Sequence, residues 1–89
     1  MKNIDMKSAI KKALKTAERG RYGEKCLAEL KKCKTPNDID RCLTMGLARK
    51  EAVSTATDLF YSEKVITKIW QANTEREITN ILIDARKSA

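Results

Sequence analysis

The sequence YGEKCLAELKKCKTPNDI at residues 22–39 returns in altered form as YSEKVITKIWQANTEREI at residues 61–78. A shift of 39 residues aligns positions 11–43 with positions 50–82 and produces ten identical pairs. Chance would give roughly two or three, and a period of about 20–50 residues is typical of stacked helical units. The sequence therefore predicts an internal repeat of two units. The identical pairs are Lys11/Lys50, Ala13/Ala52, Thr16/Thr55, Ala17/Ala56, Tyr22/Tyr61, Glu24/Glu63, Lys25/Lys64, Thr35/Thr74, Ile39/Ile78 and Leu43/Leu82.

Two of the matched positions carry the pattern that begins a helix. Thr35 and Thr74 are each followed three residues later by an acid, Asp38 or Glu77. This spacing predicts a capping box, in which the threonine hydroxyl and the acid each accept a hydrogen bond from the other residue's backbone N–H. Pro36 falls at the first helical position, where its missing N–H costs nothing.

Apolar residues between these caps recur at helical spacing in five stripes. Ser62 marks a further helix start, and Gly20 a C′ position after a helix end. Gly46 lies inside the third stripe, as a kink or a close crossing point. We predict an all-α fold of about five helices in one domain, residues 1–89, with two stacked helical-hairpin units sharing a long central helix. The stripes are Met6, Ile10, Ala13, Leu14 and Ala17; Cys26, Leu27, Leu30 and Cys33; Ile39, Cys42, Leu43 and Leu47, continued by Ala48, Ala52, Ala56, Leu59 and Phe60; Val65, Ile66, Ile69 and Ala72; and Ile78, Ile81, Leu82 and Ala85.

The three cysteines are an odd set in a chain without histidine. Their gaps of seven and nine residues fit neither a disulfide framework nor a zinc site. The repeat matches Cys26, Cys33 and Cys42 with Val65, Ala72 and Ile81, which are all apolar. We therefore expect small buried hydrophobic residues in a reducing compartment, and neither a metal nor a cofactor.

The first residues include Asp5 and no apolar run of signal-peptide length. No stretch of the sequence approaches the roughly 18 apolar residues of a membrane span. We expect a cytoplasmic protein without a membrane span.

Positive charge is divided unevenly along the chain, whose net charge is +7. Residues 1–43 hold twelve Lys and Arg against six acids, and residues 44–89 hold seven against six. On the first predicted helix cations recur every four residues, a spacing at which like charges cost about 0.2–0.5 kcal/mol per pair. This pattern indicates either a surface for an anionic partner or an ordinary solvated face. The lysines at the end of the second predicted helix have a further explanation, because cations at a helix C-terminus interact favourably with the helix dipole. The candidate binding residues are Lys7, Lys11, Lys12, Lys15, Arg19, Arg21, Lys31, Lys32 and Lys34.

Large apolar side chains replace polar ones in the second unit. Phe60 stands opposite Arg21, and Trp70 opposite Lys31. These rings either complete the core around the central helix or form an exposed apolar patch typical of a partner site. Phe60 and Trp70 are therefore candidate anchors for a partner.

Catalysis is not expected. The chain has no histidine, no glycine-rich phosphate loop and no nucleophile elbow. The first functional hypothesis is a regulatory interaction module for an acidic or amphipathic helical segment of a protein partner, with a homodimer as a further possibility. The alternative is a nucleic-acid-binding regulatory protein that uses its basic N-terminal half on the phosphate backbone.

The segment from Glu29 to Val53 resembles the helical N-terminal domains of eukaryotic transcription elongation factors. Leu30, Leu43 and Gly46 carry the resemblance together with Val53. Such domains dock short acidic-hydrophobic peptides, so the resemblance implies a helical peptide-docking fold. It covers under a third of the chain and assigns a role to no residue.

Overall fold

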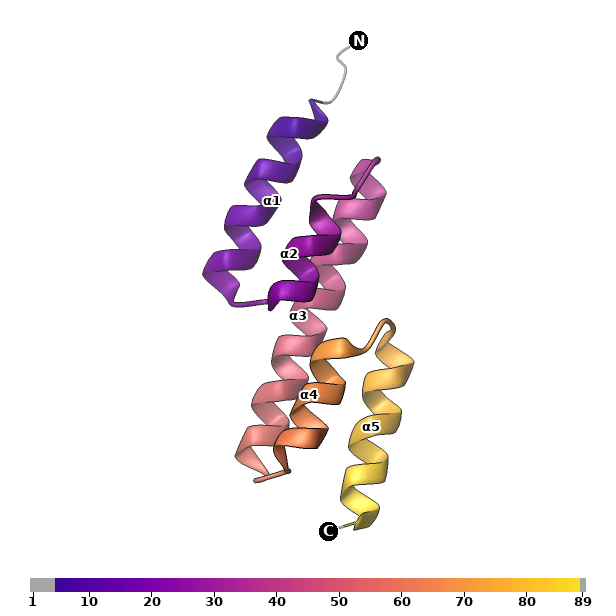
Figure 1. The fold of residues 1–89 in the computed structure, drawn as a ribbon. Coiled ribbons are helices and arrows are strands. Elements are labelled where there is room, and N and C mark those ends of the chain that lie inside the picture. Colours follow the sequence, from indigo (N-terminus) through magenta and orange to yellow (C-terminus); the bar gives the residue numbers. More distant parts are fainter. Residues whose placement is uncertain (1–4, 89) are drawn as a thin grey trace.

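The computed structural model describes residues 5–88, which form five helices and no strand (Figure 1). The prediction of an all-α fold with about five helices is confirmed. Residues 1–4 and 89 of the predicted domain lie outside the described residues. Across the described part of the chain, every helix is too short or too polar to cross a bilayer. The helices are α1 (Met6–Gly20), α2 (Glu24–Leu30), α3 (Pro36–Asp58), α4 (Glu63–Gln71) and α5 (Glu75–Ser88).

Helix α3 is the axis of an elongated molecule that measures 54 × 22 × 16 Å. Its 23 residues span about 35 Å. Helices α1 and α2 pack on the N-terminal half of α3 and form the first unit with it, whereas α4 and α5 pack on the C-terminal half and form the second unit (Figure 1). Each unit has its own buried cluster. The clusters are Ala13, Ala17, Cys26, Leu30 and Ile39 in the first unit, and Ala52, Ala56, Ile69, Ala72 and Ile78 in the second.

The two units share local geometry at the spacing of 39 residues. Helices α2 and α4 begin at matched positions, and so do the N-termini of α3 and α5. The turns that precede α2 and α4 also agree, because Arg21 and Phe60 adopt left-handed backbone with φ of 56° and 59°. Four core pairs match as well. Two copies of one unit would share these features, but the duplication itself stays a prediction. The matched core pairs are Ala13/Ala52, Ala17/Ala56, Leu30/Ile69 and Ile39/Ile78.

The expected helix starts are confirmed at Thr35 and Ser62. Thr35 Oγ1 accepts a hydrogen bond from the backbone N–H of Asp38 at 3.1 Å, and Asp38 Oδ2 accepts one from the backbone N–H of Thr35 at 3.2 Å. Ser62 accepts the backbone N–H of Val65 at 3.4 Å. The backbone N–H of Lys34 adds a bond to Asp38, which is the largest cause of a lowered pKa for that carboxyl. These caps fix the entry into α3 and α4.

The predicted role of Gly20 is wrong. Gly20 is the last residue of α1, and Arg21 takes the left-handed C-cap position one residue later. The ring of Tyr22 lies against Gly20 and fills the space that a Cβ would occupy. Gly46 is a close crossing point in a continuous helix, because an added Cβ would lie 2.7 Å from Cys26 Sγ.

The third apolar stripe is not buried along its whole length. Leu47, Leu59 and Phe60 are exposed, so this stripe does not complete the core at its end, and Phe60 follows the second of the two alternatives, an exposed apolar side chain. The physical reason for Leu59 and Phe60 is that α3 ends at Asp58, and both residues lie in the turn beyond it. Two cysteines also differ from the prediction of burial: Cys26 is buried, but Cys33 and Cys42 are only half-buried.

Candidate protein-binding surface and junction cavity

Helix α1 exposes one face of cations. The helix buries Ala13 and Ala17 against α2 and α3, so its opposite side faces solvent. Glu18 is the one acid within α1. Among the described residues, Lys25, Arg41 and Arg49 form ion pairs, and the cations of α1 take part in none of these. We call this surface the α1 cationic face; it consists of Lys7, Lys11, Lys12, Lys15 and Arg19, all exposed.

The other predicted cations lie on two connections. Arg21 occupies the turn between α1 and α2, and Lys31, Lys32 and Lys34 follow the end of α2. All four are exposed. The nine candidate cations therefore lie on three segments of the first unit, and five of them belong to one helix face.

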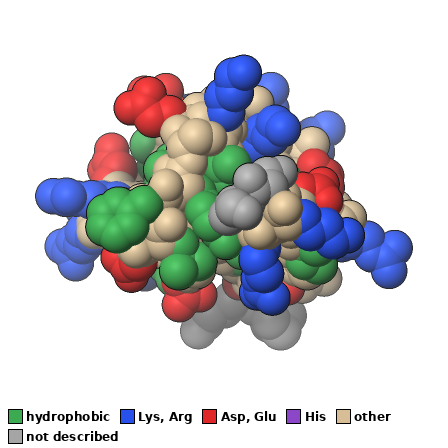
Figure 2. Space-filling model, turned by 90° about the horizontal axis from the view of Figure 1, so that it is seen from below, with side chains coloured by type: hydrophobic (Ala, Val, Ile, Leu, Met, Phe, Trp, Pro, Cys, Tyr) green, Lys and Arg blue, Asp and Glu red, His purple; other side chains and the backbone are tan. Residues whose placement is uncertain are grey.

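Phe60 projects from the turn between α3 and α4. Its side chain is 93% exposed, and its backbone is left-handed at φ 59°, a conformation that is unfavourable for a bulky residue. Leu59 beside it is 55% exposed. Seen from the lower end of the molecule in Figure 1, hydrophobic side chains gather in the middle of the surface and charged ones ring them (Figure 2). Phe60 therefore adds nothing to either core and is available for contact.

A shallow groove lies beside Phe60, between α4 and α5. Its volume is about 450 Å³, and its lining includes the apolar side chains of Val65 and Ile81. Lys64, Lys68 and Asp84 line the same groove. The second unit thus offers an apolar surface with charged residues of both signs at its border.

Trp70 lies elsewhere, at the junction of the two units. Its indole packs against Gly23, where an added Cβ would lie 2.8 Å from Trp70 Cε3. Gly23 has φ of 96°, which favours glycine. Trp70 is half-buried in this contact. The structure therefore separates the two predicted anchors: Phe60 is free, and Trp70 joins α4 to the turn before α2.

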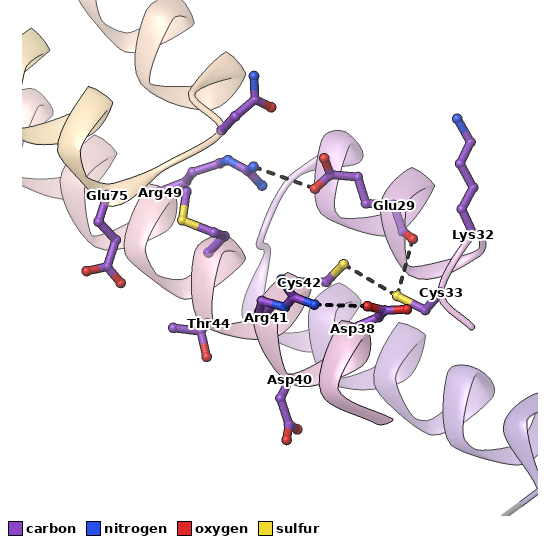
Figure 3. A pocket seen from close by; sticks show the side chains of 12 residues that line it. Glu29, Lys32, Cys33, Asp38, Asp40, Arg41, Cys42, Thr44, Arg49 and Glu75 are labelled. Carbon is purple, nitrogen blue, oxygen red and sulfur yellow. Dashed lines mark hydrogen bonds and ion pairs between the residues drawn. The ribbon is translucent and has the colours of Figure 1, made fainter. Parts of the chain in front are cut away.

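Sequence reasoning missed the most buried charge of the molecule, Arg49. Its side chain is 1% exposed, although it lies on α3 between the two cores. Arg49 Nε donates to the backbone oxygen of Ala72 at 2.7 Å, and Nη2 lies 3.6 Å from Glu29 Oε1 (Figure 3). Nη1 has no hydrogen-bond partner within residues 5–88. Arg49 thus connects α2 of the first unit with the end of α4 in the second.

The signal for Arg49 was present in the sequence. Arg49 lies three and seven residues before Ala52 and Ala56, so helical spacing places it on the buried side of α3. The same shift of 39 residues places Arg49 opposite Ile10, an apolar residue one position before the aligned stretch. Arg49 was missed because only apolar residues were assigned to the buried stripe, and a buried cation with a partner is not apolar.

A cavity of about 630 Å³ opens beside Arg49. The end of α2, the first turns of α3 and the connection between α4 and α5 form its wall (Figure 3). Cys33 Sγ and Cys42 Sγ lie 3.5 Å apart on this wall. Burial first, and then the hydrogen bond with Cys33, raise the pKa of Cys42 to about 12. Within the described part of the chain, no group of three His, Cys, Asp or Glu residues could hold a metal ion.

Comparisons with known proteins found no matching family, no matching curated protein and no matching solved structure.

Proposed function

We propose that this chain is a non-catalytic interaction module that binds an acidic, amphipathic helical segment of a protein partner. The α1 cationic face carries the proposal, because its five cations are exposed and take part in none of the ion pairs that Lys25, Arg41 and Arg49 form within residues 5–88. Cations four residues apart repeat about every 6 Å along a helix. A partner helix with acids at the same spacing presents the complementary row.

Phe60 supports a partner that is amphipathic as well as acidic. An aromatic ring that is exposed and in left-handed backbone does not stabilise the fold, and such positions are typical of functional contacts. Tyr22 touches the position of Gly46, so the end of α1 lies beside the middle of α3. Phe60 follows Gly46 by fourteen residues, which is about 21 Å along the helix axis. The distance from Lys7 to Phe60 is therefore about 40 Å along the molecule, and a partner helix of about 27 residues is long enough to reach both surfaces.

The alternative is a nucleic-acid-binding protein that places the same cations on phosphates. The net charge of +7 supports it. Against it, α1 contains no aromatic residue, and Tyr22 nearby is half-buried, so the cationic face has no ring on which a base could stack. We therefore favour the protein partner and treat nucleic acid as an outcome of the test.

The test is a titration by fluorescence anisotropy with defined probes. The first probe is an alanine-based helical peptide of about 27 residues with Glu at every fourth position and leucines at one end. The controls are a shuffled peptide of the same composition, and duplex DNA and single-stranded RNA of similar length. We expect the ordered peptide to bind about ten-fold more tightly than the shuffled one, a difference of about 1.4 kcal/mol.

Matched variants separate a specific face from general charge. Lys11→Glu with Lys15→Glu should abolish binding of the ordered peptide. Lys50→Glu with Arg76→Glu makes the same charge change at exposed positions of the second unit and should leave binding nearly unchanged. Equal loss in both double variants would contradict the proposal. Tighter, steeply salt-dependent binding to DNA or RNA would support the alternative.

A further inference from the structure

Two of the three cysteines lie side by side on the wall of the junction cavity. The sulfur atoms of Cys33 and Cys42 are 3.5 Å apart, and both thiols are free and half-buried. Cys33 belongs to the irregular connection 31–35, whereas Cys42 lies in the second turn of α3. The sulfur pair is therefore within reach of small reagents that enter the open cavity.

We propose that Cys33 and Cys42 are a modification site that a peroxide converts into an intramolecular disulfide. A disulfide has an S–S distance of about 2.05 Å, so the two sulfur atoms must approach by about 1.5 Å. The backbone of Cys33 is not helical, and this approach can take place in the connection without breaking the hydrogen bonds of α3. The bridge joins the segment after α2 to the second turn of α3.

The reaction consumes one molecule of hydrogen peroxide. The Cys33 thiolate attacks one peroxide oxygen, the O–O bond breaks, and the departing hydroxide combines with the proton that Cys33 released to give water. Cys33 is then a sulfenic acid. The Cys42 sulfur attacks the Cys33 sulfur, the S–S bond forms, the S–O bond breaks, and a second water leaves with the Cys42 proton. Two thiols lose two electrons to the peroxide, and the products are one disulfide and two waters.

The surroundings assign different parts to the three thiols. Cys33 lies in the irregular connection 31–35, and burial and the hydrogen bond with Cys33 raise the pKa of Cys42, so we expect the peroxide to oxidise Cys33 first and Cys42 to give up its proton only as it attacks the sulfenic acid. Cys26 is fully buried, and burial also raises the pKa of its thiol. The Cys26 thiol donates to the backbone oxygen of Cys42 at 3.4 Å. Cys26 should therefore remain reduced while the pair reacts.

The experiment treats the reduced full-length chain with hydrogen peroxide and measures its intact mass, its free thiols and its proteolytic peptides. We expect the mass to fall by two hydrogen atoms and the free thiols to fall from three to one, with Cys33 and Cys42 linked in the peptide map. Because the bridge closes a loop of about ten residues and so lowers the entropy of the unfolded chain, Tm should rise by about 10–20 °C. Cys26→Ala should retain the mass change, whereas Cys33→Ser and Cys42→Ser should each abolish it.

Several results would overturn the proposal. They are three free thiols after treatment, a bridge that includes Cys26, and bridges only between separate chains. If Cys26→Ala fails to fold, the peptide map of the unsubstituted protein decides which sulfurs are joined. The readouts are independent of partner binding, so this proposal and the proposed function can fail separately.

Discussion

Removal of the carboxylate of Glu29 should destabilise this protein more than removal of the arginine with which it pairs. Glu29→Gln leaves the guanidinium of Arg49 buried between the two units with one hydrogen bond, to the backbone oxygen of Ala72. Arg49→Met removes the buried charge together with its cost of desolvation. The Glu29 carboxylate is then solvated by water, because 39% of its side chain is exposed, and it retains its ion pair with Lys25 at 3.9 Å.

The geometry gives the size of the effect. At 3.6 Å and an effective dielectric constant of about 20, the attraction between Glu29 and Arg49 is about 4–5 kcal/mol. Water at the half-exposed Glu29 screens part of it, so we expect Glu29→Gln to lower the free energy of unfolding by about 2 kcal/mol. Arg49→Met loses one hydrogen bond to Ala72 and should cost about 1 kcal/mol. The double variant should resemble Arg49→Met alone.

The assay is urea unfolding followed by circular dichroism, with the four proteins compared as a double-mutant cycle. For a chain of this size, 2 kcal/mol is a shift of about 8–16 °C in Tm. Lys25→Gln is the control, because it removes the other, exposed partner of Glu29 and should cost less than about 0.5 kcal/mol. A larger cost for Arg49→Met than for Glu29→Gln, or additive effects of the two changes, would contradict this prediction.

Three further predictions concern single residues. Phe60→Gly should raise the free energy of unfolding by about 0.5–1 kcal/mol, because glycine accepts φ of 59° without strain. Phe60→Ala is the control and should not raise the free energy of unfolding. A glycine variant that is less stable than the parent would contradict the prediction. Gly46→Ala should lower the free energy of unfolding by about 1 kcal/mol, because the new Cβ would lie 2.7 Å from Cys26 Sγ and this crowding outweighs the better helix propensity of alanine. A rise in Tm would contradict the close crossing at Gly46. Asp38 has a lowered pKa, so its contribution is present above about pH 4, the unfolded pKa, and is lost as pH falls through the folded value. Asp38→Asn should therefore be less stable than the parent at pH 7, and the difference should shrink in acid; a difference independent of pH would exclude the ionised cap.

Local chemistry made the helix starts predictable. The capping residues Thr35 and Ser62 bind backbone N–H groups within three residues, so the signal needs no knowledge of the rest of the chain. The end of α1 was missed by one residue, because a turn rule that expects glycine in left-handed backbone does not anticipate Arg21 there. The predicted and observed helices agree where the determinants lie close in sequence.

Contacts between the two units could not be predicted from the sequence. Arg49 is buried because Glu29 and the backbone of Ala72 meet it, and these partners lie 20 and 23 residues away in the sequence. The neighbourhood of Cys33 and Cys42 likewise depends on how α2 returns to α3. The exposure of the predicted cations followed from the apolar stripe on the other side of α1, whereas the exposure of Phe60 depended on where α3 stops.

The most direct measurement of the proposed function is an NMR titration of the full chain with the ordered acidic peptide, read at each backbone amide. We predict saturable shifts along residues 7–19 and at Phe60, which are absent with the shuffled peptide and lost in the Lys11→Glu, Lys15→Glu variant. Shifts spread over exposed lysines of both units, or equal shifts with the two peptides, would contradict it.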